Sequence, residues 1–156
     1  MTLALVCDVS GSMAEGGKPY AMRTGVLTAA QLSRLGYMRV ETELWGWSSG
    51  MRPFPDWTAS DEFPLDLLSC SGTSNGAALI QWLEHEPNHK VAIFTDGFFL
   101  SAGKGFLNQL RKHLTANDLR FIKVGADSNP QLRGEDVFSQ EDIYVAFDDW
   151  LDFDTP

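Results

Sequence analysis

The sequence predicts an α/β fold in which a mostly parallel sheet is covered by helices on both faces. Short apolar runs, typical of buried strands, alternate along the chain with segments whose apolar residues recur at helical spacing. One short segment, Met51 to Phe54, follows a turn so closely that it would return antiparallel as an edge strand. The 156 residues fit a single domain, residues 1–156, and roughly 70% of the unfolded surface can be buried at that size.

The first predicted unit is a strand, a loop and a helix. Leu3 to Cys7 is a continuous apolar run that ends at Asp8, as expected of a strand buried on both faces. A loop rich in glycine and serine then leads to Pro19, which suits the first position of a helix. The following apolar residues fall on one side of that helix, which Gly36 would end.

The second unit is predicted to contain a strand, a turn, the edge strand and a helix. Met38 to Trp47 alternates well enough to be a strand, and Ser48 to Gly50 is the turn before the edge strand. Residues 56–72 show no regular pattern. Asn75 to Glu86 gathers its apolar side chains on one face and is predicted to be a helix.

The remaining segments repeat the alternation of strand and helix. Lys90 to Thr95 reads as a buried strand, and Phe106 to Leu114 has helical spacing. Leu119 to Gly125 and Ile143 to Phe147 are predicted to be further strands. The two aspartates that open residues 148–153 favour the start of a last helix there.

The composition narrows the classes of partner and the compartment. The formal net charge of −9, from 21 acidic and 12 basic residues, repels phosphate backbones and argues against nucleic acid. No apolar run approaches the roughly 20 residues of a membrane span, and Met1 to Cys7 lacks the regions of a signal peptide. With Cys7 and Cys70 as the two cysteines, free thiols are favoured over a disulfide. We therefore expect a cytoplasmic protein without membrane partners.

Two of the predicted parallel strands end at an aspartate. The loop after Cys7 begins with Asp8, and the loop after Thr95 begins with Asp96. Open α/β sheets bind ligands at the carboxyl ends of their strands, beside the point where the strand order reverses. We therefore expect these two carboxylates to lie together although they are far apart in the sequence.

Hydroxyl side chains accompany the two carboxylates. Ser10 and Ser12 follow Asp8 at alternate positions of a turn, and Thr73 stands just before a predicted helix. Oxygen ligands without histidine or cysteine suit a hard cation such as Mg²⁺, Mn²⁺ or Ca²⁺. Because hydroxyls are neutral ligands and only two carboxylates are present, the ion would stay electrophilic and accept a carboxylate from a partner. The predicted metal site is Asp8, Ser10, Ser12, Thr73 and Asp96.

Three motifs together resemble the von Willebrand factor A family. They are DVSGSM at residues 8–13, GTS at residues 72–74 and FTDG at residues 94–97. Each motif alone is more often a turn or a helix cap, but all three occur in the family's order and at matching strand ends. The order of elements also matches over nearly the whole chain. The likeness is greatest to the intracellular and prokaryotic branch, which occurs with chaperone-like ATPases, chelatases and the Ro ribonucleoprotein.

The resemblance implies a Rossmann-like three-layer α/β/α fold with a metal-ion-dependent adhesion site. It implies that Ser10, Ser12 and Thr73 coordinate the ion through their hydroxyls, and that Asp8 and Asp96 do so directly or through water. The sixth position would then be left for a glutamate or aspartate of a protein partner, such as an ATPase or a multi-subunit assembly. The expected function is therefore metal-dependent protein–protein interaction, without enzymatic activity.

Two other hypotheses remain open. Residues 72–76 also fit the G-x-S-x-G turn of serine hydrolases, with Ser74 as nucleophile and with Asp96 and His113 following in the Ser–Asp–His order. That turn requires a buried strand running directly into the serine, and residues 67–71 are a weak candidate for one. The third hypothesis is a structural domain of the same fold whose metal site is vestigial.

Overall fold

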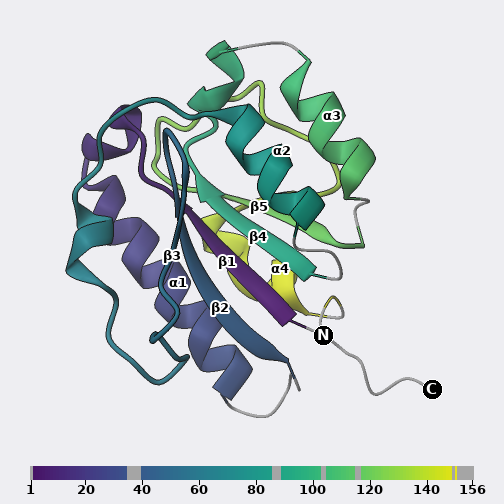
Figure 1. The fold of residues 1–156 in the computed structure, drawn as a ribbon. Coiled ribbons are helices and arrows are strands. Elements are labelled where there is room, and N and C mark those ends of the chain that lie inside the picture. The colour runs from purple at the N-terminus through teal and green to yellow at the C-terminus, as the bar shows by residue number, and fades with distance from the viewer. Residues whose placement is uncertain are drawn as a thin grey trace.

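The computed structural model describes residues 2–34, 40–85, 89–102, 105–114, 117–148 and 150. Within these residues six strands form one sheet, with helices on both of its faces (Figure 1). The strands are β1 (Thr2–Asp8), β2 (Glu41–Trp47), β3 (Met51–Pro53), β4 (His89–Thr95), β5 (Leu119–Lys123) and β6 (Val137–Ser139). The α-helices are α1 (Lys18–Arg34), α2 (Gly76–His85), α3 (Phe106–His113) and α4 (Ile143–Phe147). None of the described helices combines the length and apolar character needed to cross a membrane.

The strand order in the sheet is β3-β2-β1-β4-β5-β6. β1 pairs in parallel with two neighbours, so that Leu5 faces Leu44 of β2 on one side and Ala92 of β4 on the other. β4, β5 and β6 continue in parallel, whereas β3 runs antiparallel beside β2. The predicted mostly parallel sheet with a short antiparallel edge strand is therefore confirmed. From β1 the chain first continues to one side of the sheet, through β2 and β3, and then to the other side, through β4, β5 and β6. The strand order therefore reverses between β1 and β4, which is the position where open α/β sheets usually bind ligands.

Two apolar cores lie on opposite faces of the sheet. The side chains of β1 alternate between them: Leu3, Leu5 and Cys7 pack in the core beneath α1 and α4. Ala4 and Val6 pack in the other core, beneath α2 and α3. Because both faces of β1 are covered, its sequence is a continuous apolar run rather than an alternation of apolar and polar residues.

The prediction of a strand at Ile143–Phe147 is wrong, because this segment is the helix α4. Its first, fourth and fifth side chains are buried, and its second and third are exposed, which is the spacing of one helical face. Its strand-forming residue types suggested a strand, and five residues are too few to show helical periodicity. The strand beside β5 is instead β6, which the sequence pattern did not predict.

Several predicted boundaries fall outside the described residues. They include the end of the first helix at Gly36, the start of the second strand at Met38 and the end of the second helix at Glu86. The helix expected over residues 148–153 also lies mainly outside them. Asp148 itself has an extended backbone and forms the C-cap of α4.

Arg111 on α3 forms a bidentate ion pair with Asp136, which precedes β6. Its Nε and Nη2 atoms lie 2.9 and 2.7 Å from the carboxylate oxygens of Asp136, whose side chain is buried. We expect Arg111→Met to lower the free energy of unfolding by about 2 kcal/mol, because the buried carboxylate then loses charged hydrogen-bond donors. Urea unfolding followed by circular dichroism measures this loss. The double variant Arg111→Met with Asp136→Leu should recover most of it, and a double variant no more stable than the single one would contradict this account.

Candidate metal centre

The two aspartates of the predicted site, Asp8 and Asp96, lie at the same edge of the sheet. β1 and β4 are parallel neighbours with Cys7 opposite Phe94, so Asp8 at the end of β1 and Asp96 just after β4 lie at adjacent strand ends. Both carboxylates are fully buried. The hydroxyl of Thr95 donates a hydrogen bond of 2.6 Å to Oδ2 of Asp8 and so joins the two strand ends directly. The expectation that these distant segments converge is confirmed by this pairing.

Asp8 is held by the turn that follows β1. Its Oδ1 accepts hydrogen bonds from the backbone N–H of Ser10 at 3.0 Å and from the Ser10 hydroxyl at 2.6 Å. Burial raises the pKa of the Asp8 carboxyl above its ordinary value, while the hydrogen bonds from Ser10 and Thr95 oppose that rise. Among the described residues Asp8 forms no ion pair with a basic side chain. The site thus contains a buried carboxylate that a bound cation would stabilise.

The loop that carries Thr73 packs against the turn of Ser10. Two backbone hydrogen bonds connect them: Gly11 N–H donates to the carbonyl of Gly72 at 2.9 Å, and Ser71 N–H donates to that of Val9 at 2.8 Å. Thr73, which follows Gly72, is exposed at this edge of the sheet. The structure therefore brings the loops of the three motifs to one place.

Asp96 has a partner, Lys18, that belongs to none of the three motifs. Its Oδ1 accepts a hydrogen bond from Phe98 N–H at 3.1 Å, and its Oδ2 lies 3.1 Å from Nζ of Lys18. Lys18 is the first residue of α1 and is buried. A lysine at the positive end of a helix dipole is unfavourable locally, so its position there was the available signal that a distant acidic group holds it.

The donor set fits a hard divalent cation. Within the part of the chain that the structure describes, no three side chains of His, Cys, Asp or Glu gather as potential metal ligands. A cation at this edge would therefore depend on the hydroxyls of Ser10, Ser12 and Thr73 in addition to the two carboxylates. A shell of oxygens of this kind, around a carboxylate that has no basic partner among the described residues, would suit Mg²⁺ or Mn²⁺.

Comparison with known proteins gives a likeness of structure. No family model and no curated protein match the chain. An aerotolerance-related membrane protein from Bacteroides fragilis superposes with a TM-score of 0.56 at 14% identity, covering 80% of this chain and 68% of that one. The manganese-loaded TRAP protein of Plasmodium vivax gives a TM-score of 0.56 at 14% identity, covering 97% and 74%. A von Willebrand factor type A structure from Catenulispora acidiphila gives 0.49 at 15% identity, covering 78% and 32%.

The sheet order and the antiparallel edge strand agree with the predicted architecture, and two solved structures superpose on most of the chain. The chain has a von Willebrand factor A-like fold. At these identities the likeness concerns the fold alone. The chain spans about a third of the Catenulispora protein's chain.

The serine hydrolase hypothesis gains no support from the geometry of this von Willebrand factor A-like fold. Residues 65–68 form a short 3-10 helix, so no buried strand leads into Ser74 in this described segment. Nε2 of His113 lies 3.8 Å from Oε1 of Glu84 on α2. Asp96 pairs with Lys18 instead. In the described residues Ser74, Asp96 and His113 therefore share no hydrogen bonds.

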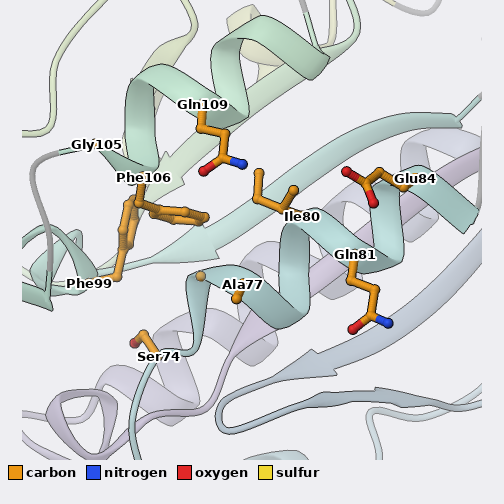
Figure 2. A pocket seen from close by; sticks show the side chains of 10 residues that line it. Ser74, Ala77, Ile80, Gln81, Glu84, Phe99, Gly105, Phe106 and Gln109 are labelled. Carbon is orange, nitrogen blue, oxygen red and sulfur yellow. The ribbon is translucent and has the colours of Figure 1, made fainter.

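A groove of about 630 Å³ runs between α2 and α3, beside the candidate metal centre. Figure 2 shows Ser74, which follows Thr73 in the sequence, at one end of the groove and Glu84 at the other. Phe99 and Phe106 form an aromatic wall, with ring centroids 5.5 Å apart and planes nearly perpendicular. The groove thus presents apolar surface close to the loop of Thr73.

Proposed function

We propose that this domain binds a protein partner through a divalent cation, Mg²⁺ or a close substitute, held at the carboxyl edge of the sheet. An aspartate or glutamate of the partner would complete the coordination shell. The observation that carries the proposal is the convergence of two buried carboxylates, Asp8 and Asp96, beside hydroxyl-bearing loops from separate parts of the chain. Asp8 supports the proposal more strongly than Asp96 does, because it is buried without a basic partner among the described residues.

In this proposal each site residue has a defined part. The hydroxyls of Ser10, Ser12 and Thr73 coordinate the cation, and Asp8 and Asp96 bind it directly or through water. The cation supplies a Lewis-acidic position for an external carboxylate. Because three of the donors are neutral, only the carboxylates of Asp8 and Asp96 offset the charge of the cation.

The fold is consistent with an interaction module rather than an enzyme. One solved structure of this fold, the TRAP protein of Plasmodium vivax, is manganese-loaded. We extend the proposal to a partner such as an ATPase or a multi-subunit assembly. We also place the protein in the cytoplasm, where Cys7 and Cys70 would remain the free thiols that the structure contains.

Mg²⁺ or Mn²⁺ is expected to raise the melting temperature of the wild-type domain but not that of Asp8→Asn. A ligand that binds only the folded state adds about 2.7 kcal/mol of stability when its concentration is about 100 times Kd. For a domain of this size that corresponds to a rise of several degrees. Thermal unfolding followed by circular dichroism, with and without EDTA, measures the effect. A wild-type melting temperature that is indifferent to both metals would refute the proposal and favour a vestigial site.

The metal-free proteins provide the control for this experiment. Because burial raises the pKa of Asp8 in the folded state, its contribution to stability is present at low pH and is lost as the pH rises through that raised pKa. At neutral pH without metal, Asp8→Asn should therefore be at least as stable as wild type. A variant that had merely lost its fold would instead melt lower under every condition.

A further inference from the structure

Lys18 places a buried positive charge inside the candidate metal centre. Its side chain is 2% exposed, and its Nζ lies 3.1 Å from Oδ2 of Asp96 and 3.3 Å from the carbonyl oxygen of Ser12. Oδ1 of Asp127 is 3.4 Å away, on a side chain that is 70% exposed. The ammonium thus contacts both the second carboxylate of the site and the turn that carries the two serines.

The ammonium stays charged at this position. Two carboxylate oxygens, Oδ2 of Asp96 and Oδ1 of Asp127, lie within ion-pair distance of Nζ and offset the cost of burying the charge. Solvent screens the exposed charge of Asp127 far more than those of the buried groups. Among the described residues, the buried charges of this site are therefore the carboxylates of Asp8 and Asp96 and the ammonium of Lys18. Together they leave one net negative charge when both aspartates are ionised.

We propose that Lys18 is a resident cation that weakens the affinity of the domain for a divalent metal and keeps the metal-loaded site positively charged. With Lys18 present, a divalent ion leaves the buried site with one net positive charge, which attracts a carboxylate. Without the ammonium the same site would be neutral once loaded. Metal binding and carboxylate binding therefore respond to Lys18 in opposite directions. This inference rests on the proposed function.

Close approach of like charges is the physical reason. A cation that coordinates Asp96 must lie within a few ångströms of an ammonium that is itself in contact with that carboxylate. The ammonium also donates a hydrogen bond to Oδ2 of Asp96, so it competes with the metal for that oxygen. A merely positioning role predicts the reverse, because loss of Lys18 would then free Asp96 to move and would weaken metal binding.

The test compares neutral and charged replacements of Lys18 in the full chain. Lys18→Gln retains hydrogen-bond donors without the charge, Lys18→Met removes both, and Lys18→Arg keeps the charge. Lys112→Met, on the exposed surface of α3, is the matched loss of a positive charge elsewhere. Titration with Mn²⁺ alone, measured by calorimetry and by the electron paramagnetic resonance signal of free Mn²⁺, gives the metal affinity. Acetate added at saturating Mn²⁺ then serves as the carboxylate probe.

Both neutral variants should bind Mn²⁺ at least about tenfold more tightly than wild type. Even in a water-like dielectric, repulsion between the Lys18 ammonium and a divalent ion a few ångströms away is large enough to lower the affinity by about that factor. At saturating metal they should bind acetate several-fold more weakly. Lys18→Arg should keep the metal affinity low, and Lys112→Met should behave as wild type. Circular dichroism confirms that each variant is folded, and Lys18→Gln preserves the test if Lys18→Met does not fold.

The outcomes separate this inference from the proposed function. If wild type binds Mn²⁺ and the neutral variants bind it no more tightly, or bind acetate as well as wild type does, the role of Lys18 is overturned and the metal site stands. If only the neutral variants bind Mn²⁺, Lys18 excludes the metal, and the proposed function of the wild-type chain fails. If no variant binds Mn²⁺, both are overturned.

Discussion

Trp47→Ala is expected to lower the free energy of unfolding by about 3–5 kcal/mol, the usual cost of truncating a buried aromatic side chain. The Trp47 side chain is fully buried at the carboxyl end of β2. Its ring centroid lies 5.5 Å from that of Phe99 and 5.9 Å from that of Phe106, so truncation would leave a cavity lined by aromatic rings. Urea unfolding followed by tryptophan-independent far-ultraviolet circular dichroism measures the loss.

The same substitution is expected to weaken the metal-induced rise in melting temperature. Nε1 of Trp47 donates a hydrogen bond of 2.9 Å to the carbonyl of Asn75, and the Trp47 carbonyl accepts one of 2.9 Å from Val9 N–H. The indole therefore anchors the loop that carries Thr73, next to the turn that follows β1. Trp47→Phe retains most of the side-chain volume but loses the indole hydrogen-bond donor. Comparing it with Trp47→Ala therefore separates the effect of the cavity from the effect of the lost hydrogen bond to Asn75.

Trp45→Ala is the matched control for the truncation. Trp45 lies two residues earlier in β2, is half-buried and packs against Trp82 with ring centroids 5.2 Å apart. Its removal exposes a gap that solvent can fill, so a smaller loss of stability and an undiminished response to metal are expected. Equal effects of the two truncations would contradict the assignment of Trp47 as the anchor of the Thr73 loop.

The strands that flank the site could be predicted from the sequence because each is buried on both faces. Leu3 to Cys7 and Val91 to Phe94 are continuous apolar runs, and Asp8 and Asp96 stand at the ends of their strands. Parallel pairing then places both aspartates at one edge. The helix α4 could not be predicted in the same way. Five residues contain little more than one helical turn, and its β-branched and aromatic residues suit a strand equally well.

The partner of Lys18 could not be predicted because it is distant along the chain, even though a lysine at a helix N-terminus indicates that some acidic group lies nearby. Asp96 lies 78 positions away, and neither the spacing of the motifs nor hydrophobic periodicity reports on such a contact. The loop before Thr73 shows the same limit, since its place beside Ser10 depends on backbone hydrogen bonds from Gly11 and Ser71 rather than on side-chain type. Sequence patterns therefore predicted that the two carboxylates lie at one edge of the sheet, but not the ammonium of Lys18 that contacts Asp96 and the carbonyl of Ser12.

Gly97→Ala is expected to be destabilising for two separable reasons. The backbone of Gly97 has φ of 83°, a left-handed conformation that costs an L-residue about 1–2 kcal/mol. A Cβ at this position would also lie 3.1 Å from Cβ of Leu132 and 3.2 Å from Cβ of Asn129, and overpacking of this kind adds about 1–3 kcal/mol. Gly16→Ala is the matched control, because Gly16 has φ of 62° and no neighbouring atom within 4 Å of the new Cβ. Urea unfolding of both variants separates the collision from the backbone conformation.

The collision at Gly97 is also expected to abolish the response to metal, whereas Gly16→Ala should retain it. Asn129 N–H donates a hydrogen bond of 2.8 Å to the carbonyl of Asp96, and its Nδ2 donates one of 3.2 Å to the carbonyl of Gly97. Displacing Asn129 and Leu132 therefore moves the backbone that carries the Asp96 carboxylate, and with it one edge of the proposed cation site. Thermal unfolding with and without Mn²⁺ measures this for both variants. If Gly97→Ala were no less stable than Gly16→Ala and kept the full metal-induced shift, Asp96 would not depend on this close packing for its position.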